Sequence, residues 1–267
     1  MRELRLRSAR REALRLLRRF GVERECPVPV EDVAHALGVR IVRGELTRAL
    51  ASLTRAGRQV RIRVSDAHVD PGQLRFSIAH ELGHYVLKHR SSLDVCDDAV
   101  IQRYFFDGEA EAEANVFAGE LLLPEPQVRR RCEVSPVDLD VVDGIASDFG
   151  TSIVAAAIRF AELTSERCAV VYAQEGRVRW VVRSATFWPA ILRGQPLAPW
   201  SIAHGYFARG EVSRACEPVD ASAWVDGHRV EREVEIFEHA RVLDHVDAVL
   251  SLIWIPESCD ALAHRVA

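Results

Sequence analysis

Apolar residues in the first half of the chain follow two different spacings. Positions three or four apart, the spacing of one helix face, recur in four stretches. These predicted helices cover residues 5–20, 32–37, 74–87 and 107–123. Shorter apolar or alternating runs, typical of strands, separate the second helix from the third. These predicted strands cover residues 39–42, 50–54 and 60–64. Helices and strands in this order predict an α+β fold for this part of the chain.

The second half begins with a stretch that contains prolines and a run of arginines. We predict a linker at 124–136, because the proline at its start cannot continue the preceding helix. Helical spacing returns at 137–149 and 152–163. Gly150 and Thr151 between them are typical of a helix stop followed by an N-cap. The two short helices resemble a helix-turn-helix in outline.

Strand-like runs dominate the C-terminal part. Runs at 169–173 and 178–183 flank a turn signal at 174–177, which predicts a hairpin. The continuous apolar run 249–255 is typical of a central strand. We therefore predict an α+β fold in three parts. They are an N-terminal domain at 1–134, a small helical segment at 135–166 and a strand-rich α+β module at 167–267.

The composition is typical of a folded protein in water. Of the 267 residues 48% are hydrophobic, enough to build cores, and the formal net charge is −4. No stretch approaches the roughly 20 apolar residues that span a bilayer, and the N-terminus lacks the apolar core of a secretory signal. The six cysteines lie far apart without a CxxC pair, so we expect free thiols. Together these features predict a cytoplasmic protein with no membrane contact.

Two histidines four residues apart carry the clearest chemical signal. His80 and His84, in the run His-Glu-Leu-Gly-His, share one face of the predicted helix 74–87 and can offer two imidazole nitrogens to one zinc ion. Glu81 lies at the edge of that face, where it can take a proton from a water molecule that the metal activates. Apolar residues fill most other positions of this helix, and a surface helix with two solvated histidines would not need them.

A catalytic zinc site needs a third protein ligand and an open position. The predicted helix 107–123 offers four candidates, Glu109, Glu111, Glu113 and Glu120. Glu111 shares a face with Asn115, whose amide oxygen could accept a hydrogen bond from a ligating imidazole. We therefore favour Glu111 as the third ligand and Asn115 as the residue that accepts a hydrogen bond from a ligating histidine. The other three glutamates are expected to be surface charges, although periodicity separates Glu109 and Glu113 from Glu111 only weakly.

Two further runs complete a family pattern. Residues 111–118 read Glu-Ala-Glu-Ala-Asn-Val-Phe-Ala, and Leu-Leu-Leu-Pro follows at 121–124. Together with the histidine motif at 80–84, these runs resemble the ImmA/IrrE family of zinc metallopeptidases over about residues 10–134. The helical stretch 145–160 also resembles the segment that follows the peptidase in that family.

This resemblance implies a fold, a metal and an activity. The fold is zincin-like, the metal is Zn²⁺ or alternatively Mn²⁺, its ligands are His80, His84 and Glu111, and Glu81 is the catalytic base. Members of the family are site-specific endopeptidases that cut a helix-turn-helix transcriptional repressor and so switch on stress-response or mobile-element genes. One branch has a GAF-like C-terminal sensor, which implies a sensory role for residues 167–267.

Two other functions compete with a peptidase. One is a non-catalytic zinc-containing sensor or scaffold that binds a transcriptional regulator, but such a scaffold would have no use for the base Glu81. The other is direct DNA binding by residues 135–166. That segment holds six acidic residues and a single basic one, Arg159, whereas a recognition helix must neutralise phosphates. We therefore predict that it supports structure or docks protein and does not bind DNA.

Three smaller questions stay open at the level of sequence. The oxyanion could be stabilised by Tyr85, His89 or Tyr104, because nothing in their spacing chooses among them. The alternating run 60–64 could be an edge strand that pairs with an extended substrate, or an ordinary half-buried strand. Four of the C-terminal histidines lack the spacing of metal ligands, so we expect packing or surface roles for them. They are His204, His228, His239 and His245.

Overall fold

The computed structural model describes residues 2–24, 26–46, 49–57, 59–66, 70–89, 108–225 and 235–259. The chain divides into two compact units. The N-terminal unit comprises Met1–Gln127 and Ile145–Ala155, and the C-terminal unit comprises Val128–Gly144 and Ala156–Ala267. Helices α7 (Leu139–Phe149) and α8 (Ile153–Leu163) therefore contribute residues to both units.

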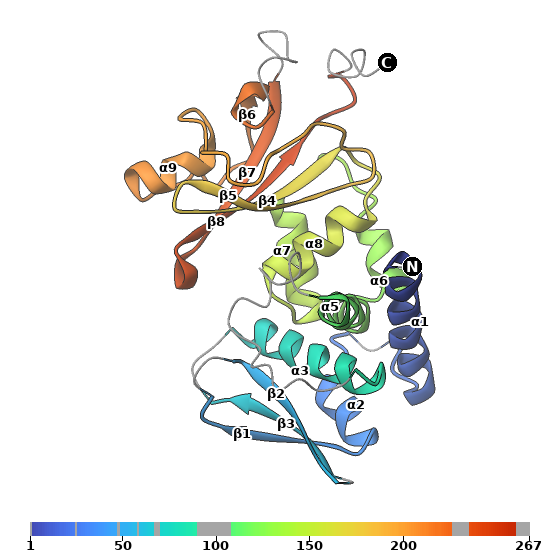
Figure 1. The fold of residues 1–267 in the computed structure, drawn as a ribbon. Helices are drawn as coiled ribbons and strands as arrows, with labels where there is room; N and C mark the ends of the chain where they lie inside the picture. Colours follow the sequence, from blue (N-terminus) through green and yellow to red (C-terminus); the bar gives the residue numbers. More distant parts are fainter. Residues whose placement is uncertain are drawn as a thin grey trace. The chain divides into compact units, whose positions relative to one another are not determined.

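The N-terminal unit combines a three-stranded sheet with several helices (Figure 1). In the sheet order β1-β3-β2, β1 runs parallel to β3 and β2 runs antiparallel to it. The elements are α1 (Arg2–Phe20), α2 (Val30–Ala36), β1 (Val39–Gly44), β2 (Ala51–Ala56), β3 (Gln59–Ser65), α3 (Pro71–Val86) and α5 (Glu109–Leu122). Each of them matches an element that the hydrophobic pattern predicts.

The stretch predicted as a linker, 124–136, contains two short helices. They are α6 (Glu125–Val128) and the 3-10 helix η1 (Arg129–Arg131). The backbone N–H of Glu125 donates to the buried carboxylate of Glu120 at 2.8 Å, so the chain starts a new turn directly after Pro124. The stretch predicted as a linker therefore contains short helical turns at residues 125–131.

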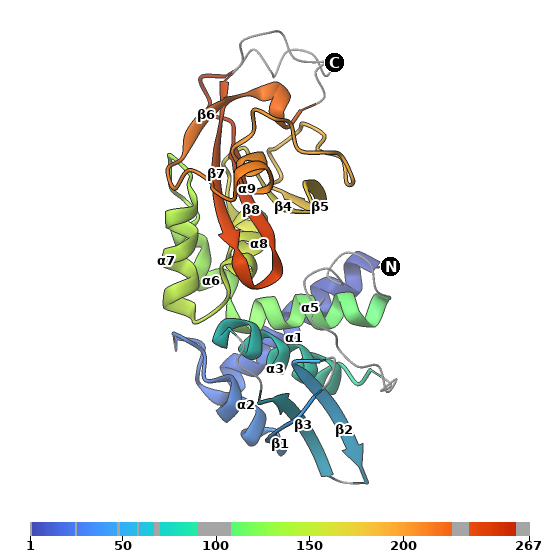
Figure 2. The same cartoon turned by 90° about the vertical axis from the view of Figure 1, so that its left-hand side faces the viewer.

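Helix α3 lies between the sheet and α5, and α1 packs on α5 (Figures 1 and 2). Ile62 from β3, Leu82 from α3 and Phe117 from α5 have no exposed surface and belong to one core. Gly83 allows the two helices to approach closely, because a Cβ atom there would lie 3.1 Å from the backbone of Ala114. The element order thus brings the predicted histidine helix against the predicted glutamate helix.

The run 60–64 is not an edge strand. It lies in β3, which pairs with both β1 and β2 and has Ile62 and Val64 buried. Alternation of apolar and polar residues reports that one face is covered, but it does not report how many strands lie alongside. Among the described strands the edges of this sheet are β1 and β2, and β3 has no free edge with which a substrate could pair.

The C-terminal unit is built on a five-stranded antiparallel sheet with the order β5-β4-β8-β7-β6. Its strands are β4 (Cys168–Gln174), β5 (Arg177–Arg183), β6 (Glu217–Asp220), β7 (Glu235–Leu243) and β8 (Ala248–Trp254). β8 is central and β4 pairs with β5 in a hairpin, both as predicted. Glu175 and Gly176 form the hairpin turn with positive φ angles of 53° and 67°.

Three elements of this unit are absent from the prediction: β6, β7 and α9 (Ile202–Arg209), which packs on β7 and β8. The short 3-10 helices are η2 (Ala221–Ala223) and η3 (Asp244–Val246). With helices and sheets in both units, the predicted α+β class is confirmed. Within the described ranges, no single helix has the length and apolar character to cross a bilayer, and only the bent pair α7 and α8, taken together, meets that test by length and composition.

Candidate metal centre

Helix α3 carries the two histidines, and hydrogen bonds define both of its ends. Asp70 accepts a hydrogen bond from the backbone N–H of Gln73 at 2.8 Å, and Pro71 is the first helical residue. At the other end Lys88 has a left-handed φ of 58°, and the N–H of His89 donates to the carbonyl of His84 at 3.1 Å. The helix therefore ends at Val86, two residues after the second histidine.

Three side chains meet between α3 and α5. Nε2 of His80 lies 3.0 Å from Nε2 of His84. The two oxygens of Glu111 lie 3.1 Å from Nε2 of His80 and 3.3 Å from Nε2 of His84. His80 is 3% exposed, whereas Glu111 is 23% exposed and leaves the cluster open on one side. When the imidazoles of His80 and His84 carry a proton on Nε2, their hydrogen bonds to Glu111 hold the pKa of its carboxyl well below its usual range.

This cluster fits a zinc ion by donor type and by spacing. Two imidazole nitrogens and one carboxylate are a ligand set that catalytic zinc sites use. Zinc–ligand distances of about 2.0–2.1 Å in a tetrahedron place neighbouring ligand atoms about 3.3 Å apart. The observed separations, 3.0, 3.1 and 3.3 Å, need to widen by only a few tenths of an ångström. In the described part of the chain, no second cluster of three such side chains occurs.

Asn115 touches the cluster from α5. Its Oδ1 lies 2.7 Å from Nδ1 of His80, and both side chains are buried. Because an amide oxygen only accepts, this contact puts the proton of His80 on Nδ1 and leaves the lone pair of Nε2 facing the cluster. Nδ2 of Asn115 finds no hydrogen-bond partner among the described residues. Leaving that donor buried is costly, so the residue is not explained by packing alone.

Glu81 is adjacent to His80 in α3 and is 4% exposed. Its carboxylate is thus held in the same buried helix as the two histidines. The structure also places the remaining glutamates of α5. Glu109 is exposed and pairs with Arg5 at 2.6 Å, as expected for a surface charge. The same expectation is wrong for Glu113, which is 15% exposed and lies 3.4 Å from His89, and for Glu120, which is buried.

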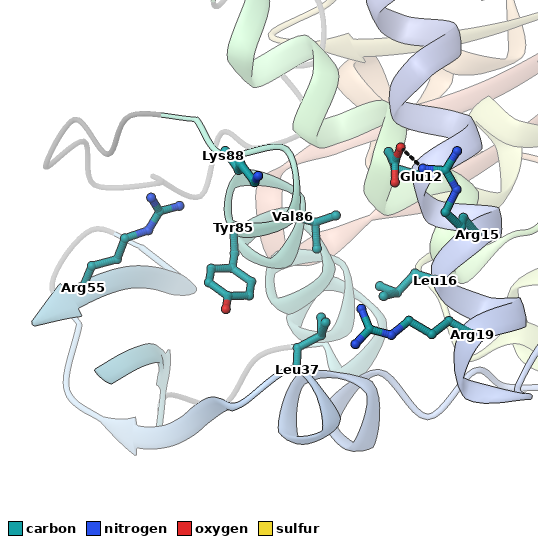
Figure 3. A pocket seen from close by; sticks show the side chains of 9 residues that line it. All are labelled: Glu12, Arg15, Leu16, Arg19, Leu37, Arg55, Tyr85, Val86 and Lys88. Atoms are coloured by element: carbon teal, nitrogen blue, oxygen red, sulfur yellow. Dashed lines mark hydrogen bonds and ion pairs between the residues drawn. The ribbon is translucent and has the colours of Figure 1, made fainter. Parts of the chain in front are cut away.

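Two of the three candidate oxyanion residues lie in the described ranges, and Tyr104 lies outside them. His89 is in contact with His84 through their Nδ1 atoms, 3.1 Å apart. Burial lowers the pKa of His89, and its hydrogen bond with Glu113 opposes that shift. Tyr85 points away from α3 into a surface groove (Figure 3). Neither placement assigns an oxyanion role.

The groove beside Tyr85 has a volume of about 380 Å³ and adjoins the C-terminal end of α3 (Figure 3). Four of its lining side chains are basic and one is acidic. The lining residues are Glu12, Arg15, Leu16, Arg19, Leu37, Arg55, Tyr85, Val86 and Lys88. The guanidinium of Arg55 lies over the ring of Tyr85 and donates to the carbonyl of His84 at 3.2 Å. One residue therefore connects this basic groove to the histidine helix.

The described histidines of the C-terminal unit join no cluster of metal-ligand side chains. Nδ1 of His239 accepts a hydrogen bond from the N–H of Leu139 at 3.1 Å, and its Nε2 lies 3.0 Å from the carbonyl of Arg214. His239 thus has a structural role at the start of α7. His204 and His245 are described and join no group of three metal-ligand side chains, while His228 lies outside the described residues.

Comparison with known proteins adds three findings. Residues 34–161 match the family model described as the IrrE N-terminal-like domain, Peptidase_M78. No curated protein sequence matches the chain. Among solved structures, a Mycobacterium tuberculosis transcriptional regulator is similar with a TM-score of 0.56 and 15% identity, over 97% of this chain and 92% of that one. At this identity the likeness concerns the fold alone.

Proposed function

We propose that this chain is a zincin-like endopeptidase. Residues 34–161 belong to the IrrE N-terminal-like family, Peptidase_M78. This match confirms the resemblance to the ImmA/IrrE peptidases. The proposed substrate is a helix-turn-helix transcriptional repressor. A cut at one site inactivates the repressor and relieves repression of stress-response or mobile-element genes. The metal is Zn²⁺, with Mn²⁺ as the alternative.

One observation carries the proposal: a complete set of three ligand side chains adjoins a buried carboxylate that is not one of them. His80, His84 and Glu111 converge within hydrogen-bond distance. Glu81 follows His80 directly in α3 and is 4% exposed. A site that only bound metal would need the three ligands and no fourth acidic group, whereas hydrolysis also needs a base.

Each residue has a separate task in the proposed reaction. His80, His84 and Glu111 would hold a zinc ion, which would supply the Lewis acidity that polarises the scissile carbonyl and makes a water molecule more acidic. Glu81 takes a proton from the attacking water as the new C–O bond forms. It then delivers that proton to the leaving nitrogen as the C–N bond breaks. Asn115 keeps His80 in the tautomer that leaves Nε2 free.

We place the substrate along β2 and the basic groove. Among the described residues β2 pairs only with β3, so its other edge can accept an extended segment by backbone hydrogen bonds. Arg55, in β2, connects this edge to the groove and to His84. Because basic side chains outnumber acidic ones in the groove, the segment that enters it is expected to carry acidic residues.

The test uses full-length protein with Zn²⁺ or Mn²⁺ and the repressor encoded beside its gene. The wild-type protein is expected to cut the repressor once, and Glu81→Gln is expected to retain the metal and lose the cleavage. If both forms bind the repressor and neither cuts it, the chain is a metal-containing scaffold for a regulator. If wild-type and Glu81→Gln cut equally well, the assignment of the base is wrong.

The remaining parts of the chain have proposed roles as well. The peptidase part at 1–134 is followed by a helical segment at 135–166, which docks protein or supports structure without binding DNA. The module at 167–267 is sensory. These roles rest on the excess of acidic residues in 135–166 and on the family resemblance.

A further inference from the structure

The ring nitrogen of His84 that faces away from Glu111 has a partner of its own. Nδ1 of His84 lies 3.1 Å from Nδ1 of His89. Nε2 of His89 lies 3.4 Å from Oε2 of Glu113, and Oε1 of Glu113 lies 3.7 Å from Arg5. The side chains of His84, His89 and Glu113 are only 11–15% exposed. These residues form a shielded chain of polar contacts that runs from α1 to the metal centre.

The donors and acceptors in this chain allow one arrangement of protons in neutral rings. A carboxylate only accepts, so Nε2 of His89 carries the proton that faces Glu113. Nδ1 of His89 is then an acceptor, and the proton between the two rings belongs to Nδ1 of His84. His84 consequently keeps the lone pair of Nε2, the atom that lies 3.3 Å from Glu111. The reverse arrangement would protonate Nε2 of His84 and prevent it from binding a metal.

We propose that His89 and Glu113 are positioning residues that hold His84 in its metal-binding tautomer and orientation. They do for His84 what Asn115 does for His80. The inference rests on the proposed function only in that it concerns the same metal centre, and it does not depend on what the enzyme cuts. Hydrogen bonds to the second nitrogen of a ligating histidine commonly contribute about 10- to 100-fold to metal affinity.

The end of α3 explains why His89 is available for this task. Lys88 adopts the left-handed conformation, and two backbone bonds close the helix: the N–H of Lys88 to the carbonyl of Tyr85 at 3.3 Å and the N–H of His89 to that of His84 at 3.1 Å. This pair of bonds is the Schellman motif. It folds the chain back, so that the residue five positions after His84 lies over the His84 ring.

The test measures zinc affinity in purified full-length protein by competition with a chromogenic chelator. In His89→Leu the acceptor is lost while an apolar side chain fills the space, and the zinc dissociation constant is expected to rise about 10- to 100-fold. His89→Asn places an oxygen where Nδ1 of His89 lies, as Asn115 does at His80, and is expected to recover most of the affinity. His35→Leu changes an exposed histidine of α2 and is expected to leave the affinity unchanged.

A role in packing alone predicts a different ranking of the zinc affinities, because His89→Asn would then bind zinc no more tightly than His89→Leu. Zinc affinity of His89→Leu within twofold of the wild type, or of His89→Asn as weak as His89→Leu, overturns the inference. If His89→Leu does not fold, judged by circular dichroism of the metal-free protein, Glu113→Leu replaces it and is expected to weaken zinc binding in the same direction. A wild-type protein that binds no zinc overturns both this inference and the proposed metal centre. Zinc binding without cleavage of a repressor overturns only the peptidase assignment.

Discussion

The C-terminal unit contains a buried carboxylate whose replacement should be costly. Glu238 in β7 has no exposed surface and accepts four hydrogen bonds. Two come from the backbone N–H groups of Ile202 and Ala203, the first residues of α9, at 2.9 Å each. The others come from Trp224 at 2.8 Å and Ser251 at 3.1 Å. The carboxylate thus satisfies helix N–H groups that have no partner within the helix.

The predicted loss in Glu238→Gln follows from the arrangement of these donors. One oxygen receives the N–H groups of Ile202 and Trp224, and the other receives Ala203 N–H and the Ser251 hydroxyl. A glutamine must turn its NH₂ group to one of these pairs. The hydroxyl of Ser251 can rotate to accept, but the N–H of Ala203 cannot. One buried donor stays unpaired, which costs about 1–3 kcal/mol of unfolding free energy.

Chemical denaturation of the full-length protein, followed by tryptophan fluorescence, measures this loss. Glu238→Ala should lose more, about 3–5 kcal/mol, because all four donors lose their acceptor. Glu235→Gln is the matched control, since Glu235 is an exposed residue of the same strand. Its unfolding free energy should stay within about 0.5 kcal/mol of the wild type. A Glu238→Gln protein as stable as the wild type would refute the reasoning from donor geometry.

Four further outcomes are expected. Asn115→Leu should weaken zinc binding about 10- to 100-fold in the chelator competition. The melting temperature of the metal-free protein should fall less than it does in a core substitution. Gly72→Ala should destabilise the fold by about 3 kcal/mol or more in denaturant unfolding, because the new Cβ would lie 2.3 Å from backbone atoms of Thr151 and Ser152. Lys88→Gly should raise the unfolding free energy by about 0.5–1 kcal/mol, because glycine adopts the left-handed conformation without strain. Burial raises the pKa of Cys168 to about 12 and that of Cys132 to about 11, so neither thiol should react with iodoacetamide at pH 8 until the protein unfolds, as peptide mass spectrometry would show.

The helices and strands that the sequence predicts are those with a regular apolar face. Helix α3 also has local signals at its start, Asp70 and Pro71, which act within one turn. Strand β7 escaped prediction because the buried Glu238 interrupts its apolar pattern, and that carboxylate is buried only because α9 and Trp224 supply donors from elsewhere. A local sequence pattern does not indicate hydrogen-bond donors that distant segments supply in the folded protein.

The candidate metal centre likewise combines contacts within one helix, which the sequence predicts, with contacts that depend on the tertiary fold. The spacing of His80 and His84 is local to one helix, so the sequence alone brings them together. Glu111 lies on a separate helix, and periodicity separated it only weakly from its neighbours. The contact between His89 and Glu113 depends on a left-handed residue at the end of α3 and on the approach of α5, and nothing in the spacing of the two residues indicates it.

Helix α5 supplies a carboxylate to the cluster and contacts on both sides of it. Glu111 reaches His80 and His84, Asn115 holds the outer nitrogen of His80, and Glu113 holds His89 against His84. All three contacts depend on one distance, the separation of α3 and α5. Gly83 permits that separation, since a Cβ there would lie 3.1 Å from the backbone of Ala114. The contacts of the candidate metal centre therefore depend on the absence of a side chain at position 83 as well as on the three candidate ligands.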